Sequence, residues 1–289
     1  MRIYTAGLSC LLLLILLFKD CNLKAQDVDT LSVHSKMDLS PVLAEISGMC
    51  VHGNDIYAIN DSGNGAYIFK IDIHTGELKE EFRLYNIRNH DWEELSIYNG
   101  YLYIADIGNN YGVRKDLAIH RVSLDSLKER KPPVLTTGIK YYMQKEYKGG
   151  MHNHEWDCEA MVVTGFGIVC FSKNWVDLVT KMYIVNEGEN NDLKAVDTFD
   201  AGFLVTGAYY QSPERSLYLC GYYKNDTYIL HFRNIDEMGF SDDYVKYVIP
   251  ELKFTQIESI FVRGNYIYLA SERTIINQAI YRVLVSGMQ

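Results

Sequence analysis

Apolar and polar residues alternate along much of this chain with the period of two that is typical of β-strands. One short phrase introduces these stretches repeatedly: an acidic residue, then small or apolar residues that lead into a strand. Copies begin at Glu45, Glu94, Glu159 and Glu258, and a degenerate copy begins at Thr206. The starts are 49, 65, 47 and 52 residues apart. Strand-like repeats of about 50 residues predict a β-propeller with one blade per copy.

Each copy is expected to form four antiparallel strands, with hairpin turns such as Asn99-Gly100 between the first two. The fifth copy ends after three strands. We therefore expect the extended segment Thr30–Leu39 to supply the missing strand, which would close an all-β, five-bladed β-propeller. The alternative is a six-bladed ring with an extra blade inside the long interval between residues 94 and 159. The innermost strands are predicted at Gly48–His52, Leu95–Tyr98, Ala160–Val163, Gly207–Tyr210 and Ser259–Val262, and the outermost strand of blade three at Leu193–Phe199.

Residues 1–26 have the pattern of a signal peptide. Arg2 precedes the apolar run Leu8–Phe18, which is too short to span a bilayer. Cleavage would leave one β-propeller domain, residues 27–289, with no transmembrane segment. The sequence therefore predicts a secreted protein, or one of the periplasm or outer envelope. The alternative is a lipoprotein attached through Cys21.

The composition agrees with a single closed domain. The 289 residues are 48% hydrophobic and 22% charged, which is ample for a core, and 23 Tyr against 5 Pro favour sheet over helix. The formal net charge of −9 argues against nucleic acid as a partner. Four cysteines outside the leader match no zinc module and are expected to be buried thiols, with a disulfide as the alternative: Cys50, Cys158, Cys170 and Cys220.

The repeated acids suggest a candidate metal site. Innermost strands line the channel of a propeller, so the four leading glutamates should approach one another at one mouth of the channel. The ends of the second strands return to the same face. Converging carboxylates need compensation, which Ca²⁺ or another divalent cation would provide through oxygen ligands. Salt bridges to Lys173 or Arg273, and hydrogen bonds from backbone N–H groups, are the alternatives. The candidate metal ligands are Glu45, Asn60, Asp61, Glu94, Asp106, Glu159 and Glu258.

A second local repeat places an Asn, a His, acids and a Trp before two neighbouring blades. It predicts a ligand-binding mouth with an aromatic surface, whereas packing of the two Trp side chains between blades is the alternative. The candidate ligand-binding residues are Asn89, His90, Asp91, Trp92, Asn153, His154, Trp156, Lys173 and Arg273. If the protein is an enzyme, the candidate general bases are His154, Asp157 and Glu159.

Several phrases in the mature chain resemble a family of secreted or envelope bacterial β-propellers, known mostly as uncharacterised proteins, particularly from Bacteroidetes. They are EISGM with NDSGN, DWEELSI with YLYIADIGNN, DCEAM, and YLASER. More distantly, the chain is similar to phytase-like, NHL and gluconolactonase-type propellers. That similarity implies a divalent ion at the channel mouth and, in some members, hydrolysis of lactones or phosphate esters. Glu45, Asn60 and Asp106 are the nearest candidates for ion ligands of the lactonase type.

The sequence favours a secreted binding or scaffold module with an acidic axial mouth. A divalent-metal-dependent hydrolase of a lactone, phosphoester or carbohydrate derivative is one alternative, and a sugar-binding lectin-like propeller is another. The partner would be a small molecule, a glycan or an envelope protein. The chain contains no nucleophile elbow, P-loop, dinucleotide fingerprint or His-Glu-x-x-His motif, which argues against serine hydrolases and nucleotide enzymes.

Overall fold

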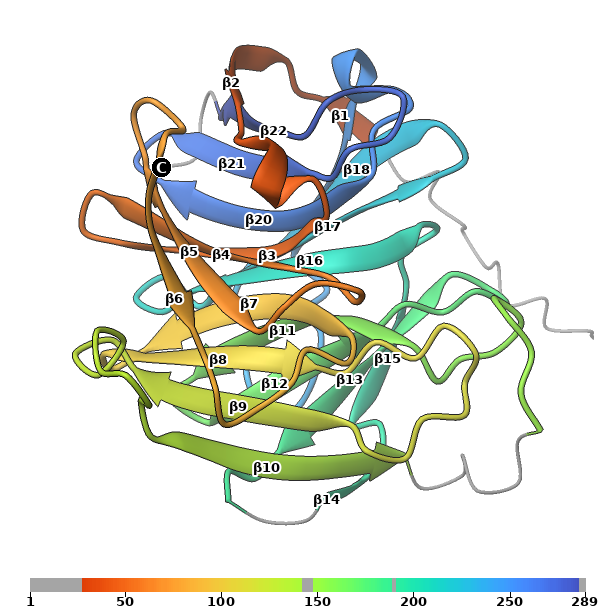
Figure 1. Cartoon of the computed structure of the whole chain (residues 1–289). Coiled ribbons are helices and arrows are strands. Elements are labelled where there is room, and N and C mark those ends of the chain that lie inside the picture. Colours follow the sequence, from red (N-terminus) through yellow and green to blue (C-terminus); the bar gives the residue numbers. More distant parts are fainter. Residues whose placement is uncertain (1–27, 142–147, 189–190, 286–289) are drawn as a thin grey trace, which may run out of the picture.

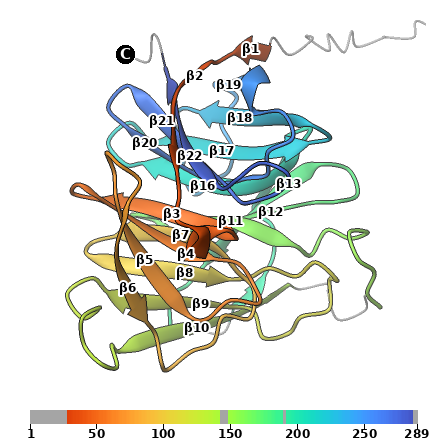
Figure 2. The same cartoon turned by 45° about the horizontal axis from the view of Figure 1, so that its top comes forward.

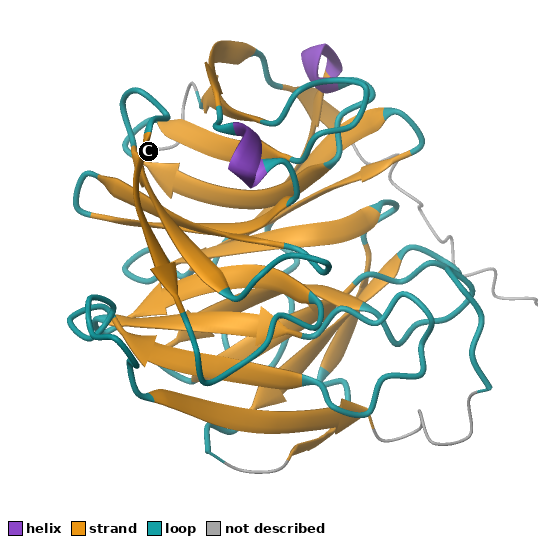
Figure 3. Ribbon diagram, in the orientation of Figure 1, coloured by secondary structure: helices purple, strands orange, loops and turns teal. Residues whose placement is uncertain are grey.

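The computed structural model describes residues 28–141, 148–188 and 191–285. Five sheets stand around one axis and form a five-bladed β-propeller, as the repeat predicted (Figure 1). Nearly all regular structure is strand, and two short 3₁₀ helices, η1 (Pro41–Leu43) and η3 (Pro250–Leu252), lie in connections (Figure 3). The predicted signal peptide and Cys21 lie outside the described residues. Within the described part of the chain, no helix has the length and apolar character needed to cross a membrane.

The blades follow the chain order, and each runs from the axis outward. Blade one contains β3 (Ile46–His52), β4 (Asp55–Asn60), β5 (Tyr67–Asp72) and β6 (Leu78–Arg83). Blade two contains β7 (Trp92–Tyr98), β8 (Tyr101–Asp106), β9 (Ala118–Ser123) and β10 (Val134–Tyr141). Blade three contains β11 (Cys158–Thr164), β12 (Gly167–Ser172), β13 (Val179–Val185) and β15 (Asp197–Asp200). Blade four contains β16 (Leu204–Gln211), β17 (Ser216–Tyr223), β18 (Asp226–Phe232) and β19 (Tyr244–Ile249). Blade five contains β20 (Ile257–Arg263), β21 (Tyr266–Ser271), β22 (Ala279–Leu284) and β2 (Val33–Asp38).

The N-terminal strand closes the ring as predicted. β2 pairs antiparallel with β22, from Val33 opposite Val283 to Asp38 opposite Ala279. The five innermost strands contact one another in cyclic order, and β20 returns to β3 (Figure 2). The described residues of the long interval after Glu94 contain only strands of blade two and its connections, and the ring has five sheets, so the six-bladed alternative is wrong.

Two short strands extend blades beyond the predicted four. β14 (Asn191–Leu193) pairs in parallel with the outer edge of β10, and β1 (Val28–Thr30) pairs in parallel with β19. The predicted outer strand Leu193–Phe199 of blade three is therefore divided: its beginning joins blade two, and only β15 stays in its own blade. An unpaired strand edge satisfies its backbone groups by taking up a passing segment, which explains this exchange.

The core consists of five apolar clusters, and each spans one pair of adjacent blades. The four cysteines outside the leader lie in these clusters as free, buried thiols, which confirms the sequence expectation. Burial of apolar side chains between neighbouring sheets is the main force that holds blades together.

The innermost strands approach most closely at a waist formed by five equivalent residues: Gly48, Glu94, Ala160, Gly207 and Ser259. A Cβ added to Gly48 would lie 2.5 Å from the backbone nitrogen of Leu95. The Glu94 carboxyl group crosses this space and accepts hydrogen bonds from the Ala208 N–H (2.9 Å) and the Ser259 hydroxyl (3.2 Å). Packing at the waist separates an acidic pocket at one end of the axis from an apolar pocket at the other.

Candidate functional site

Each of the five innermost strands contains a β-bulge at the same level. In blade one, the pairing register of the first strand with the second strand shifts between Ile46 and Gly48. The register shifts at the equivalent place in each of the other four blades. A bulge re-aims a side chain, and bulges are common beside functional sites. Four of the five bulged residues line a single pocket on the axis. The bulged residues are Ser47, Glu93, Glu159, Thr206 and Glu258.

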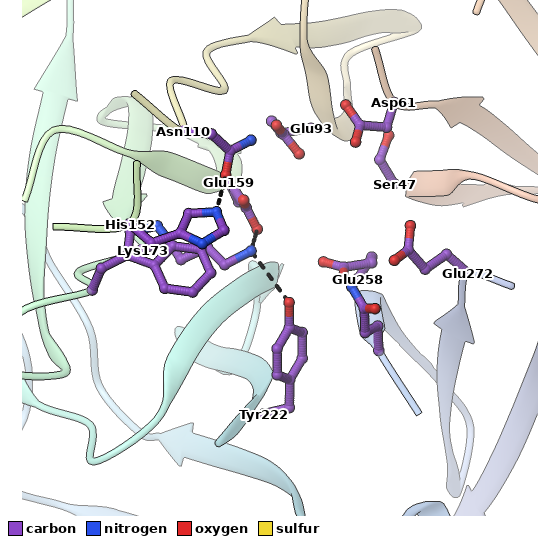
Figure 4. Close-up of a pocket in the computed structure, with 12 residues that line it drawn as sticks. Ser47, Asp61, Glu93, Asn110, His152, Glu159, Lys173, Tyr222, Glu258 and Glu272 are labelled. Carbon is purple, nitrogen blue, oxygen red and sulfur yellow. Dashed lines mark hydrogen bonds and ion pairs between the residues drawn. The ribbon is translucent and has the colours of Figure 1, made fainter. Parts of the chain in front are cut away.

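We call this pocket the axial mouth; its volume is about 150 Å³ (Figure 4). Residues at the ends of the second strands form a second tier around the bulged residues: Asp61, Lys173, Tyr222 and Glu272. Asn110, His152 and Trp175 enter from loops of blades two and three. The lining includes five carboxyl groups, and among the described lining residues Lys173 is the only lysine or arginine. The mouth is therefore strongly acidic.

Three carboxylates from blades one and two lie closest together. One oxygen from each of Asp61, Asp91 and Glu93 lies within 4.8 Å of the other two. Asp91 and Glu93 are 9% and 5% exposed. Burial and the charge of Asp61 raise the pKa of Asp91 to about 7, and the same two causes raise the pKa of Glu93 well above its usual value. Removal of water and mutual repulsion thus both disfavour the charged forms of these groups, which a bound cation would reverse.

Glu93 provides an independent indication of a ligand. Its buried Oε1 atom has no hydrogen-bond partner among the described residues. A buried oxygen without a partner is costly unless an ion or water satisfies it. Gly108 allows this arrangement, because a Cβ there would lie 2.0 Å from the same oxygen and 2.5 Å from Oδ2 of Asp91.

The loop after β8 supports the acids from behind. Arg114 donates to Oδ1 of Asp106 (2.7 Å) and to the carbonyl oxygen of Gly108 (2.7 Å), and it lies 4.0 Å from Oδ2 of Asp91. Asp106 also accepts the backbone N–H of Asp91 at 3.1 Å. Arg114 and Asp106 therefore fix the position of Asp91.

The opposite wall combines an ion pair with aromatic rings. Lys173 contacts Glu159 at 2.5 Å and Tyr222 at 3.4 Å, and its pKa is raised because neighbouring carboxylates outweigh the effect of burial. Its ammonium group lies 4.8 Å from the ring centre of Trp175, on which His152 stacks at 3.8 Å. This wall offers a flat aromatic surface beside a charged group, an arrangement that suits a small polar ligand.

Glu258 and Glu272 occupy the remaining side of the mouth, in blade five (Figure 4). Burial, opposed by Lys173, raises the pKa of Glu258 to about 7. Burial and the charge of Glu258 raise the pKa of Glu272 to about 8. Near neutral pH these two carboxyl groups are therefore partly protonated.

The structure brings together some of the predicted metal ligands and not others. Asp61, Glu159 and Glu258 line the mouth. Glu94 instead lies at the waist, where backbone and hydroxyl donors satisfy it, and Glu45 is exposed outside the mouth. The expected convergence of all four leading glutamates was therefore wrong, because the bulges place Glu93 in register with Glu159 and Glu258.

Asn60 and Asp106 lie at the ends of β4 and β8 as predicted, but neither lines the axial mouth. Asn60 donates to the carbonyl oxygen of Val42 at 2.7 Å, and its buried Oδ1 atom has no partner among the described residues. Asp106 pairs with Arg114. Their roles as metal ligands remain predictions.

The repeated Asn-His-Trp loops mainly brace the ring. Trp92 is fully buried in the core between blades one and two, so the predicted aromatic surface cannot include it. Trp156 is partly buried against the core between blades two and three. Both ring nitrogens of His154 contact backbone groups, at 2.9 and 3.1 Å. The remaining predicted residues lie outside the lining of the mouth: His90, Asn153, Asp157 and Arg273.

Asp157 is a buried brace, because its two oxygens accept the N–H of Asn109 and the indole N–H of Trp175, both at 2.8 Å. Asn153 and Arg273 have exposed side chains. His90 is exposed and contacts Asp116 at 2.9 Å. The role of Asp157 or His154 as a general base remains a prediction, although each already holds two contacts.

Sequence reasoning missed Ser47, Glu93, Trp175 and Tyr222. Glu93 was detectable in principle, since Asp-Trp-Glu-Glu offers two adjacent glutamates that must point to opposite sides of a strand. Trp175 follows the second strand of blade three, and Tyr222 lies near the end of the second strand of blade four. No repeated phrase in the sequence marks either position.

Asn89 ties blade one to blade two, and its removal should weaken both the fold and the mouth. Its amide donates to the carbonyl oxygens of Asn60 (2.8 Å) and Asp61 (2.9 Å), and its oxygen accepts the Trp92 N–H at 3.1 Å. We expect Asn89→Ala to lower the free energy of unfolding by about 2 kcal/mol in urea titrations. The exposed Asn277 provides a control, since Asn277→Ala should change it by less than about 0.5 kcal/mol. Equal effects of the two substitutions would contradict the bracing role.

Comparison with known proteins finds only distant similarity to solved structures. No family model matches the sequence, and no curated protein matches it. Among solved structures, a glucose dehydrogenase is similar at 8% identity and a TM-score of 0.49, over 88% of this chain and 99% of that one. A gluconolactonase from Xanthomonas campestris is similar at 7% identity and a TM-score of 0.47, over 84% and 72%. The Cps50 (Swd1) β-propeller domain of Myceliophteria thermophila is similar at 12% identity and a TM-score of 0.43, over 84% and 73%. These values are too low to argue function.

Proposed function

We propose that this protein is a secreted β-propeller that binds a small polar ligand at its axial mouth through a divalent cation, Ca²⁺, held by Asp61, Asp91 and Glu93. The observation that carries the proposal is the approach of these three carboxylates within 4.8 Å, with a buried oxygen of Glu93 left unpartnered. Secretion rests on the signal-peptide pattern of residues 1–26 and on the resemblance to secreted bacterial propellers.

The chemistry of the donors favours calcium. All three side chains offer oxygen, and no cysteine lines the mouth among the described residues, so soft metals lack their preferred ligands. Calcium tolerates irregular geometry and accepts six to eight oxygens, some from water or from a ligand. A ligand with hydroxyl or carboxylate oxygens would complete the coordination and rest against Trp175 and Tyr222 on the opposite wall.

Calcium should stabilise the folded protein measurably. An ion that binds only the folded state raises its stability by about 2.7 kcal/mol when present at 100 times its Kd. For a chain of this size we expect the Tm to rise by about 5 °C or more in a thermal melt. Asp61→Asn and Glu93→Gln should remove most of this rise. Glu129→Gln, at an exposed loop position remote from the mouth, should retain it.

Magnesium, manganese and zinc should each give a smaller rise than calcium at equal concentration. A Tm unaffected by millimolar calcium, or a rise of equal size in Glu93→Gln, would overturn the proposed cation site. Reversal of the rise by a chelator confirms that the ion acts at equilibrium.

A metal-dependent hydrolase is a second candidate, favoured by one observation: Glu258 and Glu272 face the mouth with pKa values of about 7 and 8. A carboxyl group that titrates near the working pH is suited to general acid–base chemistry beside a polarising cation. Calcium-loaded protein would then hydrolyse simple lactones or aryl phosphate esters, and Glu258→Gln would abolish turnover while retaining the calcium-induced rise in Tm. If neither substrate class is hydrolysed, the hydrolase candidate is excluded and the proposed binding function remains.

A further inference from the structure

A second cavity lies on the flank of blade two, away from the lining of the axial mouth. Its volume is about 330 Å³, against about 150 Å³ for the mouth. It lies where the β6–β7 loop passes over the outer strands β9 and β10. That loop contributes Tyr85, Ile87, Arg88 and His90 to the lining, and blade two contributes Asp106, Asp116, His120 and Thr136.

The two carboxylates of this cavity already have partners. Arg114 donates to Asp106 at 2.7 Å and to Asp116 at 3.2 Å, so one guanidinium bridges both. His90 adds a contact to Asp116 at 2.9 Å. Neighbouring Arg114 and imidazole groups outweigh burial and lower the pKa of both aspartates. Both aspartates are therefore engaged by neighbouring groups, whereas Arg88 is a charged lining residue outside these pairs.

The groups that retain hydrogen-bonding capacity are mainly donors. Arg88 forms no ion pair or hydrogen bond with any described residue. His120 is 6% exposed, and its Nδ1 atom lies 2.9 Å from the Thr136 hydroxyl. Its Nε2 atom faces Oδ2 of Asp106 at 3.7 Å, and this imidazole is the main group that lowers the pKa of Asp106. The cavity thus combines the exposed guanidinium of Arg88 with the buried imidazole of His120.

An apolar wall accompanies these donors. Tyr85 is 57% exposed at the cavity, an unusual position for a large aromatic side chain, and Ile87 lies in the same loop. A pocket that combines a few convergent polar groups with apolar surface is typical of small-molecule sites.

We propose that the flank cavity binds a small organic anion whose carboxylate or phosphate group contacts Arg88 and whose apolar part lies against Tyr85. Guanidinium groups match the planar, charged oxygens of both anion types. The volume suits a compact molecule. The site is separate from the cation site, and it stands whether or not the mouth holds calcium.

Calorimetric titration of the intact protein at pH 7, without calcium, tests this inference. The probes are inorganic phosphate, benzoate and the neutral sugar glucose. We expect saturable binding of phosphate, of benzoate or of both, and none of glucose. Binding of phosphate alone assigns the phosphate group, and binding of benzoate alone assigns a carboxylate with an apolar body.

Arg88→Ala should weaken anion binding about tenfold or more, because a charge-assisted hydrogen bond is lost. Arg130→Ala removes an exposed arginine outside the cavity lining and should leave the affinity unchanged. Circular dichroism confirms that each variant is folded. The inference is overturned if neither anion binds, if glucose binds instead, or if Arg88→Ala retains the original affinity.

Discussion

Gly48→Ala should lower the free energy of unfolding by about 4 kcal/mol or more, which is at the upper end for a single substitution. The added Cβ would lie 2.5 Å from the backbone nitrogen of Leu95 and 2.8 Å from Cα of Glu94. Both contacts are to backbone of the next innermost strand, so no side chain can rotate away. Relief requires blades one and two to move apart, which opens the waist and breaks contacts around the ring.

The predicted loss of stability comes from the close contacts at residue 48 and not from replacing a glycine as such. Gly165 provides the matched control, because the nearest atom to an added Cβ there is the Tyr98 hydroxyl at 3.7 Å. Gly165→Ala should be neutral or stabilise the protein by up to about 1 kcal/mol, since alanine restricts the unfolded chain. Urea titrations of both variants provide the comparison. A loss of less than about 1 kcal/mol in Gly48→Ala would mean that the blades are not tightly packed at the waist.

The architecture was predictable because it depends on features that repeat. Strand patterning with a period of two, copies about 50 residues apart and a fifth copy one strand short together predict five blades closed by an N-terminal strand. β2 then pairs with β22 as expected. Each of these inferences tolerates errors of one or two residues.

The site was less predictable because it depends on single residues. A bulge inserts one extra residue, and a shift of one residue moves a side chain to the other face of a strand. The repeated phrase placed Glu94 beside Glu159, whereas the bulge places Glu93 there and leaves Glu94 at the waist. Sequence periodicity does not reveal a bulge, so the repeated phrase indicated an acidic pocket on the axis but assigned Glu45 and Glu94 to it wrongly.

The acidic mouth should make the metal-free protein less stable as pH rises, the reverse of ordinary acid denaturation. Burial raises the pKa of Glu258 from 4.5 to about 7, and burial with the charge of Glu258 raises that of Glu272 from 4.5 to about 8. The folded state therefore holds protons that the unfolded chain has released. Their contribution to stability is fully present below about pH 4.5 and is lost as pH rises through 7 and 8.

The size of the effect follows from the shift in pKa. Each unit corresponds to about 1.4 kcal/mol, so Glu258 alone accounts for about 3 kcal/mol between pH 4.5 and pH 7. We expect the free energy of unfolding in chelator-treated protein to fall by about 3 kcal/mol or more from pH 5.5 to pH 8.5. Urea titrations at half-unit steps of pH measure this slope.

Two comparisons separate this mechanism from a general effect of the acidic surface. The double variant Glu258→Gln, Glu272→Gln should show a clearly smaller slope, with the remainder due to Asp91 and Glu93, whose pKa values are also raised by burial, whereas Glu129→Gln at the exposed loop should retain the full slope. Saturating calcium should remove or reverse the slope, since a cation bound to carboxylates favours their ionised forms. Stability that stays constant or rises between pH 5.5 and pH 8.5 in the metal-free protein would show that water screens the carboxyl groups of blade five far more than their burial implies.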